Sequence, residues 1–129
     1  MRRLSPLVLL ALASCVSNET HAPSVERVAA PSLDVIKAEQ QAATKAYVFC
    51  LMRNARDLDD RRSDPGSIAT GVQSACAREF DANVDAHTRY LSIGLDGREK
   101  VAVVLRREGY AAATQFVLKH RNGTLVIPK

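Results

Sequence analysis

The stretch RDLDDRRSDPG, residues 56–66, separates two segments in which apolar residues recur every three or four positions. So many charged side chains in a row are expected to end a helix. Asp64 and Pro65 are expected to start the next one, because Asp caps helix N-termini and Pro is tolerated at the first helical position. The pattern predicts two antiparallel helices joined by a turn that centres near Ser63.

On the N-terminal side of this turn, Ser32 can cap the first predicted helix. Its expected inward positions are spaced by three and four residues: Ile36, Ala43, Tyr47, Cys50, Leu51 and Leu58. Residues 46–52 are apolar throughout, and Val48, Phe49 and Met52 exceed what one helix face needs. We therefore expect this stretch to be covered on more than one side, or to offer an apolar surface to a partner.

On the C-terminal side, a second helix is predicted from Pro65 with one apolar face: Ile68, Val72, Cys76, Phe80, Val84, His87 and Leu91. A break follows over residues 92–97. Asp96 and Glu99 have the spacing of a capping box, which predicts a third helix to about Arg121. Its expected apolar positions are Val101, Val104, Leu105, Tyr110, Ala113 and Val117. Gly109 is expected to bend this helix or shift its face.

Two interpretations of the C-terminus remain open. Asn122 and Gly123 can close the third helix in a left-handed cap and leave residues 124–129 extended. The same pair can instead form the turn of a hairpin between residues 116–118 and 125–127. With aromatic residues at 5% and no Trp, the composition favours an all-α fold of about three antiparallel helices packed through small side chains.

The N-terminus has the order of a secretory signal: Arg2 and Arg3, an apolar run over residues 7–13, and small residues before Cys15. The run is about half of the roughly 20 residues that a bilayer-spanning helix needs. Leu12-Ala13-Ser14-Cys15 resembles the lipobox of bacterial lipoproteins.

That resemblance implies cleavage between Ser14 and Cys15, lipidation of the Cys15 thiol and acylation of the new amine. Two or more acyl chains give a durable membrane anchor. Because Val16 and Ser17 follow the cysteine, the resemblance also implies delivery to the periplasmic face of the outer membrane. The expected organisation is a signal peptide over residues 1–14, a lipidated cysteine and flexible tether over residues 15–31, and a helical domain over residues 32–129.

With Cys15 used by the lipid, Cys50 and Cys76 remain. An oxidising compartment favours a bond between them. Each lies 13 residues from Ser63, so a helical hairpin places both at the same height, about 20 Å from its tip. The sequence therefore predicts a disulfide between the first two helices.

The remaining signals bear on function. Removal of Arg2 and Arg3 leaves 16 basic against 14 acidic side chains, which is no electrostatic footprint for nucleic acid. Asp57, Asp59, Asp60 and Asp64 do not match a calcium loop, so we expect a solvated helix end there. The basic residues of the third helix indicate a solvent-facing side: Arg98, Lys100, Arg106, Arg107, Lys119 and Arg121.

We found no motif for catalysis, a metal or a cofactor. His87 lies on the inner face of the second helix, where a packed or hydrogen-bonded histidine is the expectation. The predicted function is a non-enzymatic binding or structural accessory module, held at the membrane by its lipid and contacting another envelope protein. The alternative is a small ligand-binding or enzymatic periplasmic domain that uses His87.

Overall fold

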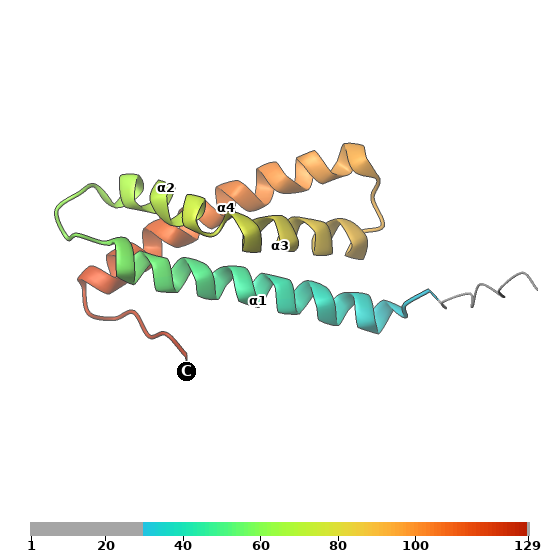
Figure 1. Ribbon diagram of the computed structural model, residues 1–129, viewed down its shortest axis with the longest axis horizontal. Coiled ribbons are helices and arrows are strands. Elements are labelled where there is room, and N and C mark those ends of the chain that lie inside the picture. The colour runs from blue at the N-terminus through green and yellow to red at the C-terminus, as the bar shows by residue number, and fades with distance from the viewer. Residues whose placement is uncertain (1–29, 129) are drawn as a thin grey trace, which may run out of the picture.

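The computed structural model describes residues 30–128, which form four helices (Figure 1). They are α1 (Leu33–Leu58), α2 (Pro65–Ala75), α3 (Ala77–Tyr90) and α4 (Leu95–Arg121). No strand occurs between residues 30 and 128. The all-α fold is confirmed, but the expected number of about three helices is corrected to four. The predicted signal peptide, Cys15 and most of the tether lie outside the described residues.

The four helices pack as two pairs that share one core. α1 and α3 lie side by side, whereas α2 packs mainly on α4, which crosses the bundle obliquely (Figure 1). The α1–α2 connection and the end of α4 lie at one end of the bundle. The start of α1 and the α3–α4 turn lie at the other end (Figure 1).

The predicted second helix is two helices, broken at Cys76. The N–H of Cys76 is shared between the carbonyls of Val72 and Gln73, and its backbone leaves helical geometry at φ −102° and ψ 21°. The break lets α2 follow α4 while α3 follows α1, which one straight helix could not do. Because neither Gly nor Pro stands at this position, the local sequence does not indicate the break.

Three helix ends follow the predicted capping chemistry. The Ser32 hydroxyl accepts a hydrogen bond from the Val35 N–H (3.4 Å), and the Asp64 carboxylate accepts one from the Ser67 N–H (3.1 Å). At the end of α4, Gly123 adopts φ +70°, and the Thr124 N–H donates to the Lys119 carbonyl (2.8 Å). Together with the lack of strands through residue 128, this cap selects the extended C-terminus over the hairpin.

The start of α4 differs from the prediction. The helix begins at Leu95 after Gly94, and no side chain caps it. Asp96 already lies in the first turn, where its charge complements the helix dipole instead of capping the end. The capping-box assignment was therefore wrong by about one helical turn at most, within the usual scatter of helix boundaries.

The core is built from small and medium side chains of all four helices. Its fully buried members include Ala55, Ala69 and Ala113, which let helix backbones approach closely. The larger buried residues are Tyr47, Leu51, Val72, Phe80, Val84 and Val117.

Four residues expected on the apolar faces are exposed instead: Leu58, Leu91, Val104 and Tyr110. Leu58 and Leu91 stand at helix ends, where no neighbouring helix covers them. α4 contacts the core through a stripe that includes Gly109 and Ala113. Val104 and Tyr110 lie at the edges of this contact: Val104 borders a hollow toward α3, and the Tyr110 hydroxyl lies beside Gly66 of α2. The apolar excess of α1 is largely used inside the fold. Leu51 is buried, and Val48, Phe49 and Met52 are half-buried.

Candidate binding site

Cys50 and Cys76 form a disulfide with a Cα–Cα distance of 5.9 Å. The predicted pairing is present, with its position corrected: the bond joins α1 to the residue between α2 and α3, not to the middle of one long helix. The Asn54 side-chain amide donates to the Cys50 carbonyl (3.0 Å). The Cys50–Cys76 disulfide therefore fixes the bend at Cys76 against α1.

His87 lies in a hydrogen-bonded network between α1 and α3. Its Nδ1 lies 3.0 Å from the Asn83 carbonyl oxygen, and its Nε2 lies 2.9 Å from the Gln40 side-chain nitrogen. The carbonyl can only accept and the amide nitrogen can only donate, which assigns the proton to Nδ1 and leaves Nε2 as an acceptor. Thr44 extends the network to the buried Asn83 side chain (3.0 Å).

This geometry uses both ring nitrogens of the neutral His87 imidazole to join two helices. It favours the hydrogen-bonded core histidine over a histidine poised for catalysis or metal binding. His87 also borders an apolar hollow between α3 and α4, lined further by Leu91, Val101, Val104 and Leu105. Between residues 30 and 128, no three His, Cys, Asp or Glu side chains gather closely enough to hold a metal ion.

Asp59 is not part of a solvated helix end. Its side chain is fully covered, and its carboxylate binds the Arg121 guanidinium at 2.7 Å. His120 Nδ1 lies 3.3 Å from the same carboxylate, and the Arg61 N–H donates to it (3.0 Å). The Arg121 hydrogen bonds, the largest cause, lower the pKa of Asp59 to about 2. This cluster joins the end of α4 to the α1–α2 turn, so its role is structural.

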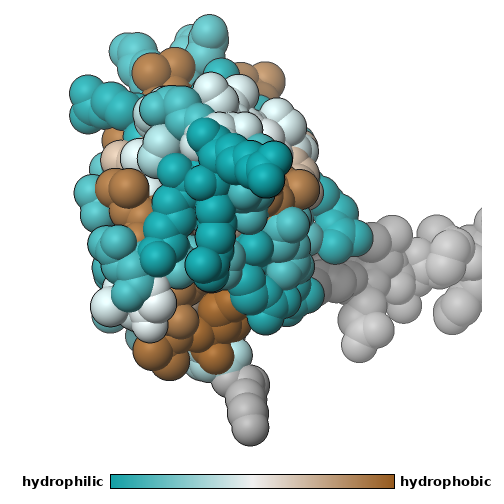
Figure 2. All heavy atoms as spheres, turned by 90° about the vertical axis from the view of Figure 1, so that its left-hand side faces the viewer, coloured by the Kyte–Doolittle hydropathy of each residue, from teal (hydrophilic) through white to brown (hydrophobic). Residues whose placement is uncertain are grey.

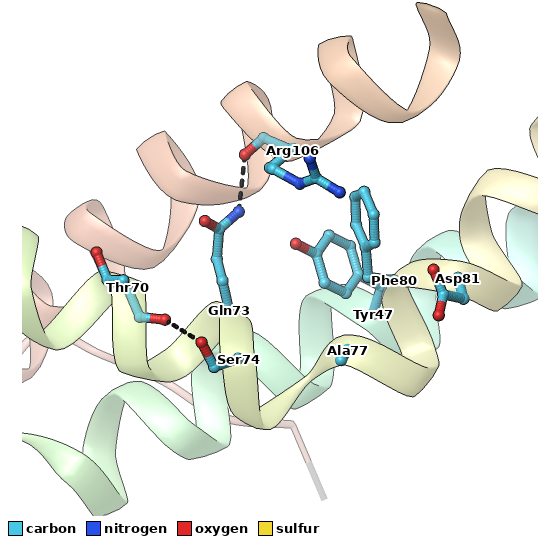
Figure 3. A pocket seen from close by; sticks show the side chains of 8 residues that line it. All are labelled: Tyr47, Thr70, Gln73, Ser74, Ala77, Phe80, Asp81 and Arg106. Atoms are coloured by element: carbon cyan, nitrogen blue, oxygen red, sulfur yellow. Dashed lines mark hydrogen bonds between the residues drawn. The ribbon is translucent and has the colours of Figure 1, made fainter. Parts of the chain in front are cut away.

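A cavity of about 390 Å³ opens between α2, α3 and α4, with Tyr47 of α1 at its back (Figure 3). Tyr47 and Phe80 supply an aromatic floor, with ring centroids 5.6 Å apart. The Arg106 guanidinium lies over the Phe80 ring at 5.3 Å from its centroid. Polar side chains complete the wall: Thr70, Gln73, Ser74 and Asp81. This size and mixture of aromatic and polar groups are typical of small binding pockets.

Tyr47 and Gly109 form the closest approach of α1 to α4. Tyr47 is 4% exposed, and its hydroxyl has no hydrogen-bond partner among residues 30–128. Burial, the largest cause, raises the pKa of the Tyr47 phenol, so the group stays neutral. The neighbouring Gln73 side-chain nitrogen donates to the Arg106 carbonyl (2.7 Å) instead. A Cβ atom on Gly109 would overlap the Tyr47 hydroxyl, which explains the glycine in mid-helix.

The cavity continues into a stripe on the outer face of α4. Val103, Arg106, Arg107 and Tyr110 follow helical spacing and line a second hollow of about 350 Å³ beside Gln73. Val103 and Tyr110 are exposed apolar residues. Neither Arg106 nor Arg107 makes an ion pair within the described residues. We call these four residues the α4 stripe.

The sequence predicted the basic side of α4 but not the cavity between α2, α3 and α4. Arg106 and Arg107 were expected to face solvent, and they do. Tyr110 was expected in the core, and Phe80 and Gln73 gave no local signal of a shared pocket. These residues meet only because the break at Cys76 turns α2 toward α4.

No family model, curated protein or solved structure matches the chain. Within residues 30–128, no helix combines the length and the apolar character that crossing a bilayer requires.

Proposed function

We propose that this protein is a lipid-anchored, non-enzymatic accessory module of the bacterial envelope that binds another protein through the α4 stripe and its cavity. The observation that carries the binding role is the stripe itself. It places two arginines, which make no ion pair with any residue from 30 to 128, between exposed Val103 and Tyr110, beside a cavity with an aromatic floor. Arg and Tyr are enriched in protein interfaces and among the residues that dominate their affinity.

The same chemistry indicates the partner. Guanidinium groups bind carboxylates in two-pronged hydrogen bonds, and they hold this geometry better than Lys does. The expected partner segment places a carboxylate on Arg106 or Arg107 and an apolar or aromatic side chain against Phe80. Rim charges of this kind mainly set the association rate and the choice of partner.

The envelope location is supported by the three cysteines. Disulfides persist in oxidising compartments, and the Cys50–Cys76 bond leaves Cys15 as the third cysteine, within a lipobox-like motif. Labelling cells with a radioactive fatty acid tests the anchor. The wild-type protein should incorporate label, and the Cys15→Ser variant should not. Equal labelling of both would refute the lipidation.

Site-specific photocrosslinking in intact cells tests the binding role. A photoreactive phenylalanine analogue at Tyr110 should give a discrete crosslinked species, whereas the same analogue at the exposed Gln115 of α4 should not. The double variant Arg106→Glu, Arg107→Glu should lose that species. Arg61→Glu, Arg62→Glu is the matched control, because it changes the same charge in the exposed α1–α2 turn.

Capture that is equal at residues 110 and 115, or unaffected by the charge reversal on α4, would contradict the assignment. If small-molecule binding replaced protein binding, purified protein would keep its ligand and the crosslinked species would be absent. That outcome would favour the alternative of a ligand-binding domain, with the Tyr47 cavity in place of His87 as its site.

A further inference from the structure

The two ends of the bundle differ in character. At the end formed by the α1–α2 turn and the end of α4, hydrophilic residues cover the centre of the face, and hydrophobic patches lie around its edges, with one at the lower edge (Figure 2). At the opposite end, the α3–α4 turn reads Leu91-Ser92-Ile93-Gly94-Leu95. Leu95 is 86% exposed, and Leu91 beside it is also exposed. Exposed apolar side chains that gather into one patch mark sites of interaction with proteins or membranes.

The start of α1 lies at this same apolar end. Arg89 of α3 pairs with Glu39 of α1 at 3.2 Å, and the next residue of α1, Gln40, contacts His87. Leu33, the first residue of α1, is 68% exposed. The chain that leads to Cys15 therefore enters the domain beside the α3–α4 turn.

From this arrangement we infer that the α3–α4 turn inserts Leu91 and Leu95 into the bilayer surface to which the lipid anchor holds the protein. The inference rests on the proposed lipid anchor at Cys15. The predicted tether, residues 15–31, is 17 residues long. A chain of 17 residues spans at most about 60 Å even when fully extended.

Such a short tether holds the turn at an effective concentration of about millimolar near the lipid. At this concentration the α3–α4 turn occupies the membrane surface even if its affinity is too low to bring an untethered domain there. Exposed leucines beside a tyrosine suit contact with a membrane surface. Leucines can enter the apolar region, and Tyr side chains favour the boundary between lipid and water. Tyr90, partly exposed, directly precedes the turn.

The charges near the α3–α4 turn indicate whether it contacts the membrane by apolar insertion or by attraction to anionic lipids. Residues 33–40 and 85–100 carry four basic side chains against five acidic ones. Arg89 and Arg98 are paired with Glu39 and Asp85, the latter at 2.8 Å. With no excess of positive charge, apolar insertion holds the turn in the membrane, and attraction to anionic lipids does not.

This orientation also suits the α4 stripe. α4 begins at the membrane-facing turn and runs toward the hydrophilic end. Val103, Arg106, Arg107 and Tyr110 lie along its middle, away from the turn. A domain standing on this end keeps the stripe accessible to a partner in the periplasm.

Fluorescence quenching in reconstituted vesicles tests the inference. The full-length acylated protein is prepared with Leu95→Cys, or with Val126→Cys as a matched control. Val126 is also apolar and 77% exposed, but it lies in the segment after α4, which leaves the opposite end of the bundle and runs back below α1 (Figure 1). Each thiol receives a solvent-sensitive fluorophore, and the vesicles contain phosphatidylethanolamine and phosphatidylglycerol with acyl chains brominated or not.

The label at residue 95 should be quenched by the brominated lipids, and the label at residue 126 should not. Exchange of phosphatidylglycerol for phosphatidylcholine should leave the quenching unchanged, because the contact is apolar. Protein that floats with the vesicles while its residue 95 stays unquenched would overturn this inference and leave the anchor standing. Quenching at both positions, or quenching that needs anionic lipid, would also overturn it. Protein that does not float at all would refute the anchor itself.

Discussion

The contact between Tyr47 and Gly109 allows a double-mutant test of how α1 meets α4. Gly109→Ala alone places a Cβ on the Tyr47 hydroxyl and close to the Gln73 amide. Overpacking a core in this way costs about 1–3 kcal/mol. The higher helix propensity of Ala than of Gly offsets at most about 1 kcal/mol of this cost. We expect a net loss of about 1–2 kcal/mol, which corresponds to a melting temperature lower by roughly 4–15 °C in a domain of about 100 residues.

Tyr47→Phe removes the hydroxyl that has no partner. Leaving a buried polar group unsatisfied costs about 1–3 kcal/mol, so this variant should be at least as stable as the wild type. In the Tyr47→Phe background, the new Cβ of Gly109→Ala meets no oxygen. Only the ring carbon and the Gln73 amide remain near, at 3.0 and 3.1 Å. The loss should therefore shrink by about 1–2 kcal/mol.

Chemical denaturation of the four proteins measures this coupling directly. Ala111→Gly, at an exposed position two residues further along α4, serves as a control for helix propensity, because it changes the same backbone preference in the opposite direction. An equal loss from Gly109→Ala in both backgrounds would show that the Tyr47 hydroxyl does not set the helix approach.

Three further predictions concern residues elsewhere in the fold. Reduction of the Cys50–Cys76 bond, which spans 26 residues, should cost roughly 3.5 kcal/mol in the chain-entropy model and leave the far-ultraviolet circular dichroism helical. His87→Leu should cost about 1–3 kcal/mol in thermal melts, since the part-buried side-chain nitrogen of Gln40 loses its hydrogen bond to the ring; a more stable variant would contradict the network. The depressed pKa of Asp59 implies that its carboxylate stabilises the fold above its unfolded pKa near 4 and loses that effect as the pH falls toward 2. The stability difference between the wild type and Asp59→Asn should close over that range, and a difference independent of pH would argue against the ion pair.

The sequence predicted the features that depend on local pattern. The caps at Ser32 and Asp64, the left-handed Gly123 and the pairing of Cys50 with Cys76 all follow from residue type and spacing. Each is a short-range rule, or a rule about two positions equidistant from a turn. Periodicity was also sufficient to identify an all-helical fold.

The features that were missed depend on partners far apart in the chain. Asp59 was predicted to face solvent because no residue near it in the sequence indicates its partner, Arg121, which lies 62 residues later. The break at Cys76 has no Gly or Pro to mark it, and it follows from the different neighbours of α2 and α3. Because this break was not predicted, the side of α4 that faces its neighbours was predicted wrongly. Tyr110 was therefore expected in the core, although it lies at the surface.

The Cys50–Cys76 bond also changes the covalent topology of the molecule. Residues 50–76 become a closed ring that contains the last third of α1, the α1–α2 turn and all of α2. The most exposed backbone of this ring is the charged turn around Arg61 and Arg62. A protease that cuts there opens the ring without dividing the molecule: the two fragments stay joined, and they separate only when the disulfide is reduced. If the N-terminus carries the proposed lipid anchor, a nicked molecule therefore keeps both halves attached to the membrane.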